Sequence, residues 1–444
     1  MKFIDELPLD NDADRSSGWG RLDVHARRVR TLYMEPLRTV ISPNIYLRIR
    51  AMRDSPFLPG LKKIYIPNNP SLDFSSALFL ASGSALNLVQ IDGDAISDRG
   101  FFVPFLSSLY IKSPGLSHLA LRGVLPSKSV EHIHRFTELQ SLEIRLSGPD
   151  LRPQLLHKLG QLPHLLDLII DTGDVSTSFQ PHTTPDSISS SKFRQLRHLQ
   201  ILGTSTSISS VFDELKGLTT LSALKIDLKS GFGMWGKTES WRSFFEAIST
   251  FSAVEDIEIF NRPGDTISTS SLAPLLILNN LKSFVINMKI LFSGSDDDFR
   301  LLGGFSKLKK FVVPGSLASL YHLSRECPDL REIKITLSSN ISNNLDDIKK
   351  LPHPIVRNHQ HPLEKLYIDS DFGQLQPIQL VHVARFLDLI FPNLSILETD
   401  NSKLTEAANW AGIHELRSAL RDARINPSSV TDNCDSVSTE KKDS

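Results

Sequence analysis

Leu116-Ser-His-Leu-Ala-Leu121 is one copy of a tract, Leu-x-x-Leu-x-Leu, that decides the fold of this chain. The same spacing of leucine-type residues returns in Leu139-Gln-Ser-Leu-Glu-Ile144 and in Leu165-Leu-Asp-Leu-Ile-Ile170, and it occurs thirteen times between Leu61 and Thr399. The first positions of successive tracts lie 22 to 33 residues apart. A recurrence close to the roughly 20–29 residues of a leucine-rich repeat predicts a solenoid of that class.

The tracts predict short strands, and the segments between them predict helices. Within a tract the apolar residues alternate with polar ones, which is the period of a strand with one buried face. Between tracts, apolar residues at helical spacing predict helices over Pro153–Leu162, Val211–Leu218, Trp241–Phe251, Leu272–Leu281, Leu317–Cys327 and Gln379–Phe391. Because strands about 4.8 Å apart stack beside helices about 10 Å wide, the array has to curve with its strands inside. The predicted fold is an α/β leucine-rich-repeat solenoid, a horseshoe with parallel strands on its concave face and helices on its convex face.

The repeats also set the expected domain organisation. A weaker copy, Val29/Leu32/Met34, precedes the first clear tract, so an irregular leucine-rich-repeat solenoid of about 13–14 repeats is expected over residues 19–403. Apolar residues such as Trp410 and Leu416 suit a C-terminal capping helix over 404–425. Residues 1–18 and 426–444 are polar and lack an apolar period, so we expect a disordered N-terminal segment and a disordered tail.

Two departures from a regular repeat predict irregular loops. Three insertions, Val175–Lys192, Gly294–Asp298 and Ser338–His361, are too polar to pack and should be exposed and mobile. Position nine of the repeat, which is asparagine or cysteine in a regular solenoid, is Asn69 once and otherwise varies. An asparagine ladder is therefore not expected, and the turns after the strands should differ from one another.

Composition limits the classes of partner and the cellular compartment that we expect for this protein. The chain of 444 residues has 49 basic and 50 acidic residues and a pI near 6.9, so its bulk charge does not favour nucleic acid. Two cysteines cannot build a disulfide framework, and Met1 to Arg15 has no apolar leader, which indicates an intracellular protein, cytoplasmic or nuclear. No apolar run reaches the roughly 18 residues of a membrane span. A monomer that binds neither nucleic acid nor membrane is expected.

The polar residues between the buried leucines should face the concave side, where a protein target would bind. Two acidic clusters stand out, Asp167 with Asp171, and Asp227 with Asp256 and Glu258. Aromatic residues supply contact area at low entropic cost and are the expected anchors. The predicted partner-binding residues are Tyr65, Arg122, Arg145, Asp167, Asp171, Asp227, Asp256, Glu258, Phe260, Lys334 and Tyr367. The alternative is that these are merely the charges of a solvated strand face.

Other motifs give little support for catalysis. Gly231-Phe-Gly-Met-Trp-Gly-Lys-Thr238 matches the phosphate-binding loop, so a P-loop-like nucleotide-binding protein is the alternative function. The repeat register continues across this segment, however, and such loops occur in sheets covered on both faces, which favours a glycine-rich insertion. His353, His359 and His361 lack a spaced partner for a metal and suggest a solvated loop. Cys327 should be buried and inert, and Cys434 is in the tail; we expect no catalytic residue, no cofactor and no metal.

Four stretches resemble a large family of fungal, basidiomycete-type proteins that combine an F-box with irregular leucine-rich repeats. They are the basic and apolar run from Trp19 to Leu32, Glu326-Cys-Pro-Asp-Leu-Arg-Glu-Ile333, Phe391-Pro-Asn-Leu-Ser-Ile-Leu397, and Trp410-Ala-Gly-Ile413 with the arginine-rich segment after it. The resemblance covers about residues 19 to 425. It implies a substrate receptor, in which an F-box binds the Skp adaptor of a cullin-RING ubiquitin ligase and the concave repeats hold the protein to be ubiquitinated.

The sequence departs from this family before Trp19. An F-box has a Leu-Pro start followed by several apolar turns, whereas the residues after Leu7-Pro8 run polar through Ser17. We therefore expect the F-box to be missing, by truncation or by evolution, so that a Skp/cullin ligase is a partner only if an F-box is supplied. A repeat-only scaffold with no connection to ubiquitin ligases is the third reading.

Overall fold

A computed structural model gives the fold of the chain. It describes residues 20, 23–34, 56–67, 86–93, 96, 99–124, 130–146, 153–172, 193–229, 238–261, 266–287, 289–291, 304–305, 307–337, 345–346, 348, 351, 361–370, 374–399 and 404–425. The chain divides into two compact units, Met1–Gly231 and Phe232–Ser444. We describe each unit by itself.

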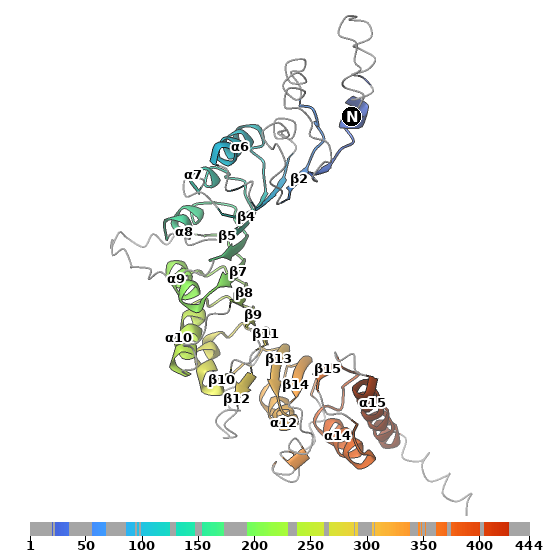
Figure 1. Cartoon of the computed structure of the whole chain (residues 1–444). Coiled ribbons are helices and arrows are strands. Elements are labelled where there is room, and N and C mark those ends of the chain that lie inside the picture. Colours follow the sequence, from blue (N-terminus) through green and yellow to red (C-terminus); the bar gives the residue numbers. More distant parts are fainter. Residues whose placement is uncertain are drawn as a thin grey trace, which may run out of the picture. The chain divides into compact units, whose positions relative to one another are not determined.

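Unit 1 is a parallel sheet with helices along one side (Figure 1). Its eight described strands follow one another in chain order, and each pairs in parallel with the next. They are β1 (Thr31–Tyr33), β2 (Lys63–Ile66), β3 (Leu88–Asp92), β4 (His118–Gly123), β5 (Ser141–Leu146), β6 (Asp167–Asp171), β7 (His198–Gly203) and β8 (Ala223–Leu228). The helices are α6 (Arg99–Lys112), α7 (Val130–Ile133), α8 (Pro153–Leu159) and α9 (Ser205–Leu215).

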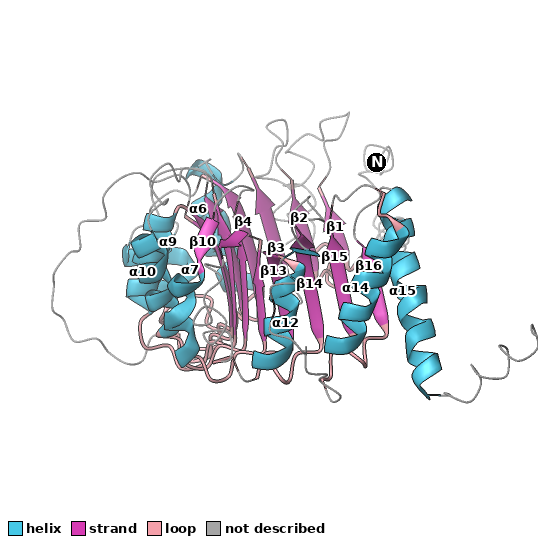
Figure 2. Cartoon of the chain, turned by 90° about the horizontal axis from the view of Figure 1, so that it is seen from below, coloured by secondary structure: helices cyan, strands magenta, loops and turns pink. Residues whose placement is uncertain are grey.

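Unit 2 repeats this arrangement. Six parallel strands pair in the order β9 (Asp256–Phe260), β11 (Ser283–Ile286), β13 (Lys310–Gly315), β14 (Glu332–Leu337), β15 (Lys365–Asp369) and β16 (Ile396–Thr399). Its helices are α10 (Thr238–Ser249), the 3-10 helix η2 (Thr269–Ile277), α12 (Leu317–Glu326), α14 (Pro377–Ile390) and α15 (Leu404–Ile425). Two short strands, β10 (Thr266–Ser268) and β12 (Lys289–Leu291), form a separate parallel pair. Figure 2 shows that the helices lie beside the strands that they follow in the chain, and not between them.

The repeated leucines form the core between strands and helices. The first two apolar positions of all thirteen tracts are buried, from Leu61 and Ile64 at one end to Leu394 and Leu397 at the other. Parallel strands on one side and helices on the other side of this core confirm, in each unit, the predicted α/β leucine-rich-repeat fold. Among the described helices, none combines the length and the apolar character needed to cross a membrane.

Each of the six segments with helical spacing contains a helix, with shifted ends in most cases. Side-chain caps explain where two of these helices begin. The Thr204 hydroxyl accepts from the backbone N–H of Ser207 at the start of α9, and Ser316 and Ser319 form a reciprocal capping box at the start of α12. The segment predicted at Leu272–Leu281 is the 3-10 helix η2, which contains Pro274. Pro274 lacks a backbone N–H, which disfavours a continuous α-helix there.

Helix α15 packs against α14 and β16 at the end of unit 2. Trp410 is buried, and its indole N–H donates to the Ser370 hydroxyl over 3.0 Å. The buried Arg417 guanidinium donates to the backbone carbonyls of Phe391 and Leu394, next to the last strand. Carbonyl groups at the end of α14 and in the following turn are thus satisfied by a side chain from α15.

One expectation about loops was wrong. Ser338–His361 was expected to be exposed, but His361 and Leu351 within it are buried. One local asparagine bridge joins two turns: the Asn287 side chain accepts from the backbone N–H of Asn261 over 2.6 Å and donates to its carbonyl over 2.8 Å. Neither asparagine is at position nine, so the repeat pattern did not reveal the bridge. Val175–Lys192, Gly294–Asp298, 1–18 and 426–444 lie outside the described residues.

Candidate interaction surface

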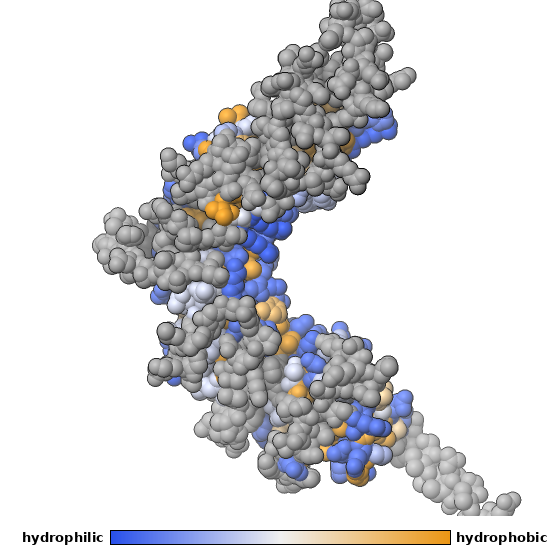
Figure 3. Space-filling model, in the orientation of Figure 1, coloured by the Kyte–Doolittle hydropathy of each residue, from blue (hydrophilic) through white to orange (hydrophobic). Residues whose placement is uncertain are grey.

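We call the side of each sheet that faces away from the helices its strand face. Along most strands, buried residues alternate with residues that project onto this face, as in β8, where Lys225 and Asp227 lie between buried neighbours. Strand register aligns these residues into rows. The central row of unit 1 is Tyr33, Tyr65, Gln90, Ala120, Glu143, Ile169, Gln200 and Lys225, and that of unit 2 is Glu258, Val285, Val312, Lys334, Tyr367 and Glu398. Figure 3 shows hydrophilic residues gathered over the central strands of unit 1.

A charged network occupies the middle of the strand face in unit 1. The Arg122 guanidinium donates twice to the Glu143 carboxylate, over 2.8 and 3.0 Å. Arg145 Nε lies 2.5 Å from the same carboxylate, and Asp92 lies 3.9 Å from Arg122. The predicted residues Arg122 and Arg145 are therefore brought together by Glu143, which the sequence-based site did not include.

The network keeps its central carboxylate ionised. Burial alone would raise the pKa of Glu143, but the hydrogen bond and charge of Arg122, together with Arg145, outweigh burial and lower the pKa below its ordinary value. The hydrogen bond to Glu143 likewise raises the pKa of the Arg122 guanidinium. Opposite charges thus neutralise one another within the surface.

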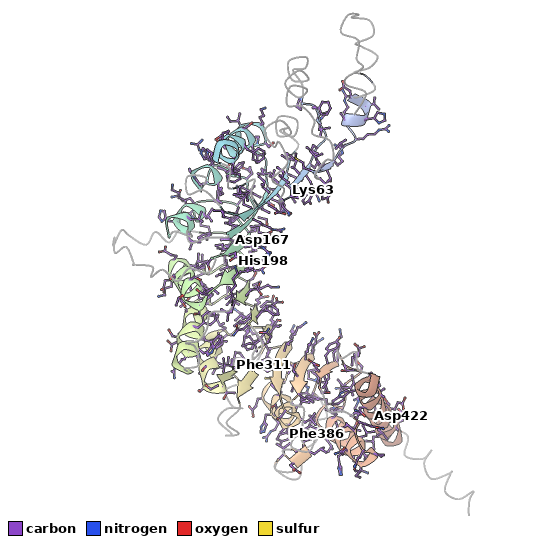
Figure 4. All side chains as sticks on the ribbon, viewed as in Figure 1. Lys63, Asp167, His198, Phe311, Phe386 and Asp422 are labelled. Carbon is purple, nitrogen blue, oxygen red and sulfur yellow. The ribbon has the colours of Figure 1, made fainter. Side chains whose placement is uncertain are left out.

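Each of the three predicted acidic residues of unit 1 has a partner on another strand or in the turn after one. Asp167 Oδ1 lies 2.5 Å from His198 Nδ1, and Figure 4 shows the two labelled residues close together. Asp171, which is 8% exposed, accepts from the Lys229 ammonium over 2.5 Å. Asp227 accepts from the Gln200 amide over 2.8 Å. The first predicted cluster is therefore two separately paired carboxylates rather than a patch of like charge.

The remaining predicted residues are in unit 2. Asp256, Glu258 and Phe260 alternate with buried isoleucines along β9. Lys334 and Tyr367 are register partners on β14 and β15, and both are half-buried in the central row. The second predicted acidic cluster is thus divided between Asp227 of unit 1 and two carboxylates of unit 2.

Tyr65 lies at the other end of the chain, where its ring stacks on Tyr33. The ring centroids are 4.6 Å apart and the ring planes differ by 8°. Tyr33 was missed because its tract is the weak copy Val29/Leu32/Met34. The signal was nevertheless present, since Tyr33 and Tyr65 both occupy position five of their tracts.

Cys327 and His361 belong to the core of unit 2. Burial raises the pKa of the Cys327 thiol to about 12, as expected for an inert cysteine. His361, expected in a solvated loop, is buried: its Nε2 bonds to the Cys327 carbonyl over 3.2 Å, and its Nδ1 accepts from the Leu363 N–H over 3.2 Å. Both ring nitrogens are therefore used by backbone groups. The described residues include no group of three metal-binding side chains in a suitable arrangement.

Several motifs from the sequence lie outside the described residues. They are the phosphate-binding-loop match up to Lys237, the histidines His353 and His359, and Cys434. Thr238, the last residue of the loop match, begins α10.

No protein-family model matches this chain, and no curated protein matches it. Solved structures similar to it include that of the LRIM1/APL1C complex, with 12% identity and a TM-score of 0.35, covering 93% of this chain and 68% of the other. The complex of Rad7 and Elc1 in yeast is similar at 14% identity and a TM-score of 0.33, covering 74% of this chain and 82% of the other. Similarity at this level carries no argument about function.

Proposed function

We propose that this chain is a non-catalytic protein-interaction module whose strand faces hold a protein target. The observation that carries the proposal is the central row of each unit, in which ten of the fourteen side chains are polar or aromatic and all are at least partly exposed, on strands whose other side is a packed leucine core. A rigid strand fixes the positions of its side chains, so a partner binds without first ordering them. The proposed contact residues are Tyr65, Arg122, Arg145, Asp167, Asp171, Asp227, Asp256, Glu258, Phe260, Lys334 and Tyr367.

Paired charges also favour recognition over turnover. In the Arg122–Glu143 pair and the Lys229–Asp171 pair, the charged groups already bind each other. A catalytic acid or base needs access to a substrate proton, whereas paired charges at a surface contribute to specificity and to the rate of association.

Site-specific photo-crosslinking tests this proposal. A benzophenone amino acid placed at Gln200 or Tyr367 samples the strand faces, and the same group at Asp213 on α9 or Glu246 on α10 samples the helix sides of the two units. In cells we expect the strand positions to form adducts with distinct proteins. The helix positions should not form adducts with those proteins. Adducts confined to the helix positions, or absent from all four, would contradict the proposal.

The resemblance to F-box proteins suggests a more specific role. We propose that the repeats are the substrate-recognition part of a ubiquitin-ligase receptor, which joins a Skp adaptor and a cullin when an F-box is supplied. Fusing an F-box to residue 19 should lead to co-purification of Skp and cullin and to ubiquitination of the proteins crosslinked at Gln200. Crosslinked proteins that are bound but never modified would instead favour a scaffold unconnected to ligases.

A further inference from the structure

The tyrosine stack joins β1 and β2, the first two described strands of unit 1. Tyr33 is 64% exposed although its ring stacks on Tyr65. The stack covers one face of the Tyr33 ring and leaves that residue largely open to solvent. Register places Lys63 beside Thr31 and Tyr65 beside Tyr33, so Lys63 and Tyr65 project onto the same strand face. Figure 4 labels Lys63 on β2.

Basic residues gather where β1 and β2 begin, and the backbone N–H groups of Lys62 and Lys63 both donate to the Arg30 carbonyl there. Residues 23–34 and 56–67 contain five basic side chains, Arg27, Arg28, Arg30, Lys62 and Lys63, and one acidic side chain, Asp23, which gives a net charge of +4. The whole chain has a net charge of −1, so the remainder has −5. All five basic residues are exposed, and the Arg30 guanidinium is held by a hydrogen bond to the Gly60 carbonyl over 2.9 Å. Positive charge is therefore concentrated where β1 and β2 begin, in a chain whose remainder is net acidic.

We propose that this basic tyrosine surface, comprising Arg27, Arg28, Tyr33, Lys62, Lys63 and Tyr65, binds an acidic, extended segment of a partner protein. Carboxylates of the segment contact the exposed lysines and arginines, and an apolar or aromatic side chain packs on the open face of Tyr33. Charge complementarity of this kind steers association and excludes basic partners. Tyrosine and arginine are also among the residues that most often dominate binding energy at protein interfaces.

A protein segment fits this surface better than single-stranded nucleic acid. Proteins that bind single strands present successive aromatic platforms along a basic groove. Here the two rings stack on each other, and the central row continues with Gln90, Ala120 and the carboxylate of Glu143. Neither an aromatic platform nor an uninterrupted basic track continues along that row.

The inference rests on the proposed function, since it takes the strand face as the binding surface. The experiment below is chosen so that failure of the inference can be distinguished from failure of the proposed function. The probe is a fluorescent peptide of alternating glutamate and leucine, with a lysine–leucine peptide and oligothymidine as the other two probes. The full chain should bind the glutamate peptide with an affinity that falls steeply with salt. Lys62→Glu/Lys63→Glu should weaken binding by at least roughly tenfold, and Tyr33→Ala by roughly fivefold, whereas Tyr33→Phe should stay within roughly twofold.

Matched variants exclude indirect effects. Arg135→Glu/Arg194→Glu makes the same change in charge at exposed positions of unit 1, away from β1 and β2, and should leave peptide binding unchanged. Far-ultraviolet circular dichroism should show that all variants remain folded, and Lys62→Gln/Lys63→Gln provides a milder substitution. Equal binding by the two double charge reversals, or tighter binding of oligothymidine than of the glutamate peptide, would overturn the inference. If the inference fails in this way but the protein crosslinks at Gln200 persist in the Tyr33→Ala variant, the proposed function is still supported.

Discussion

At the scale of single residues, His361 shows how burial fixes a protonation state. The residue is 2% exposed, and the neutral form of its side chain satisfies two backbone groups. Burial lowers its pKa from 6.5 to about 4, against the opposing effect of the Cys327 carbonyl. A proton added to Nδ1 would displace the Leu363 N–H and place a charge in the core.

This histidine should make the stability of unit 2 depend on pH. Because the folded-state pKa is depressed, the unfolded chain takes up the proton first, and stability is lost as pH falls from 6.5 towards 4. Between pH 7 and 5 the expected loss is about 2 kcal/mol. Urea unfolding at both pH values measures it, with His361→Asn as the variant that should lack this component. An identical pH dependence in the two proteins would refute the assignment.

Glu143 is the second residue whose environment makes a testable difference. Its side chain is 13% exposed, and its carboxylate lies between Arg122 and Arg145. Glu143→Gln leaves two guanidinium groups facing a neutral amide, so the free energy of unfolding should fall by about 1–3 kcal/mol at pH 7. The exposed Glu138→Gln should change it by less than about 0.5 kcal/mol. Since the pKa of Glu143 is lowered, the difference between wild type and variant should shrink as pH falls through that lowered value.

At the scale of elements, visible periodicity decided what could be predicted. Strands such as β4 and β7 follow from alternation around Leu119 and Leu199, because a one-residue shift would expose the leucines. Helix α6 was missed: it contains Pro104 and has apolar residues on more than one side, with Phe105 buried and Ile111 exposed. Helical periodicity requires a single apolar stripe, which α6 does not present.

Helix α15 should stabilise the end of unit 2. Truncation after residue 403 removes buried Trp410 and Ile413 and the Arg417 hydrogen bonds, whereas truncation after residue 425 removes none of them. Loss of a buried tryptophan alone costs about 3–5 kcal/mol. We expect the chain that ends at residue 403 to unfold at a lower urea concentration than the chain that ends at residue 425. If the shorter chain is insoluble, the full-length Trp410→Ala variant should likewise unfold at a lower urea concentration than the unchanged full-length chain. Equal midpoints would mean that α15 does not act as a cap.

At the scale of the whole molecule, the sequence predicts which side chains lie on a strand face, but it does not predict which of them form hydrogen bonds or ion pairs with one another. Spacing within a tract places Tyr65 or Tyr367 on a strand face without any knowledge of its neighbours. The bond between Asp171 and Lys229 joins residues 58 positions apart and depends on a turn that has no sequence signature. For the same reason the sequence presented Asp167 and Asp171 as one acidic cluster, whereas each of the two carboxylates has its own partner.

A repeat fold also predicts how far a local defect should spread. Leu199 and Leu366 are buried at equivalent positions of β7 in unit 1 and β15 in unit 2, and Leu→Ala at either site should cost about 2–5 kcal/mol. Because each repeat packs only on adjacent ones, Leu199→Ala should speed hydrogen exchange in Asp167–Asp171, His198–Gly203 and Ala223–Leu228 more than in Lys365–Asp369. Leu366→Ala should give the reverse pattern, with the largest change in β14, β15 and β16. Hydrogen exchange followed by mass spectrometry measures both, and a uniform increase along the chain in either variant would show that the leucines belong to one globally cooperative core.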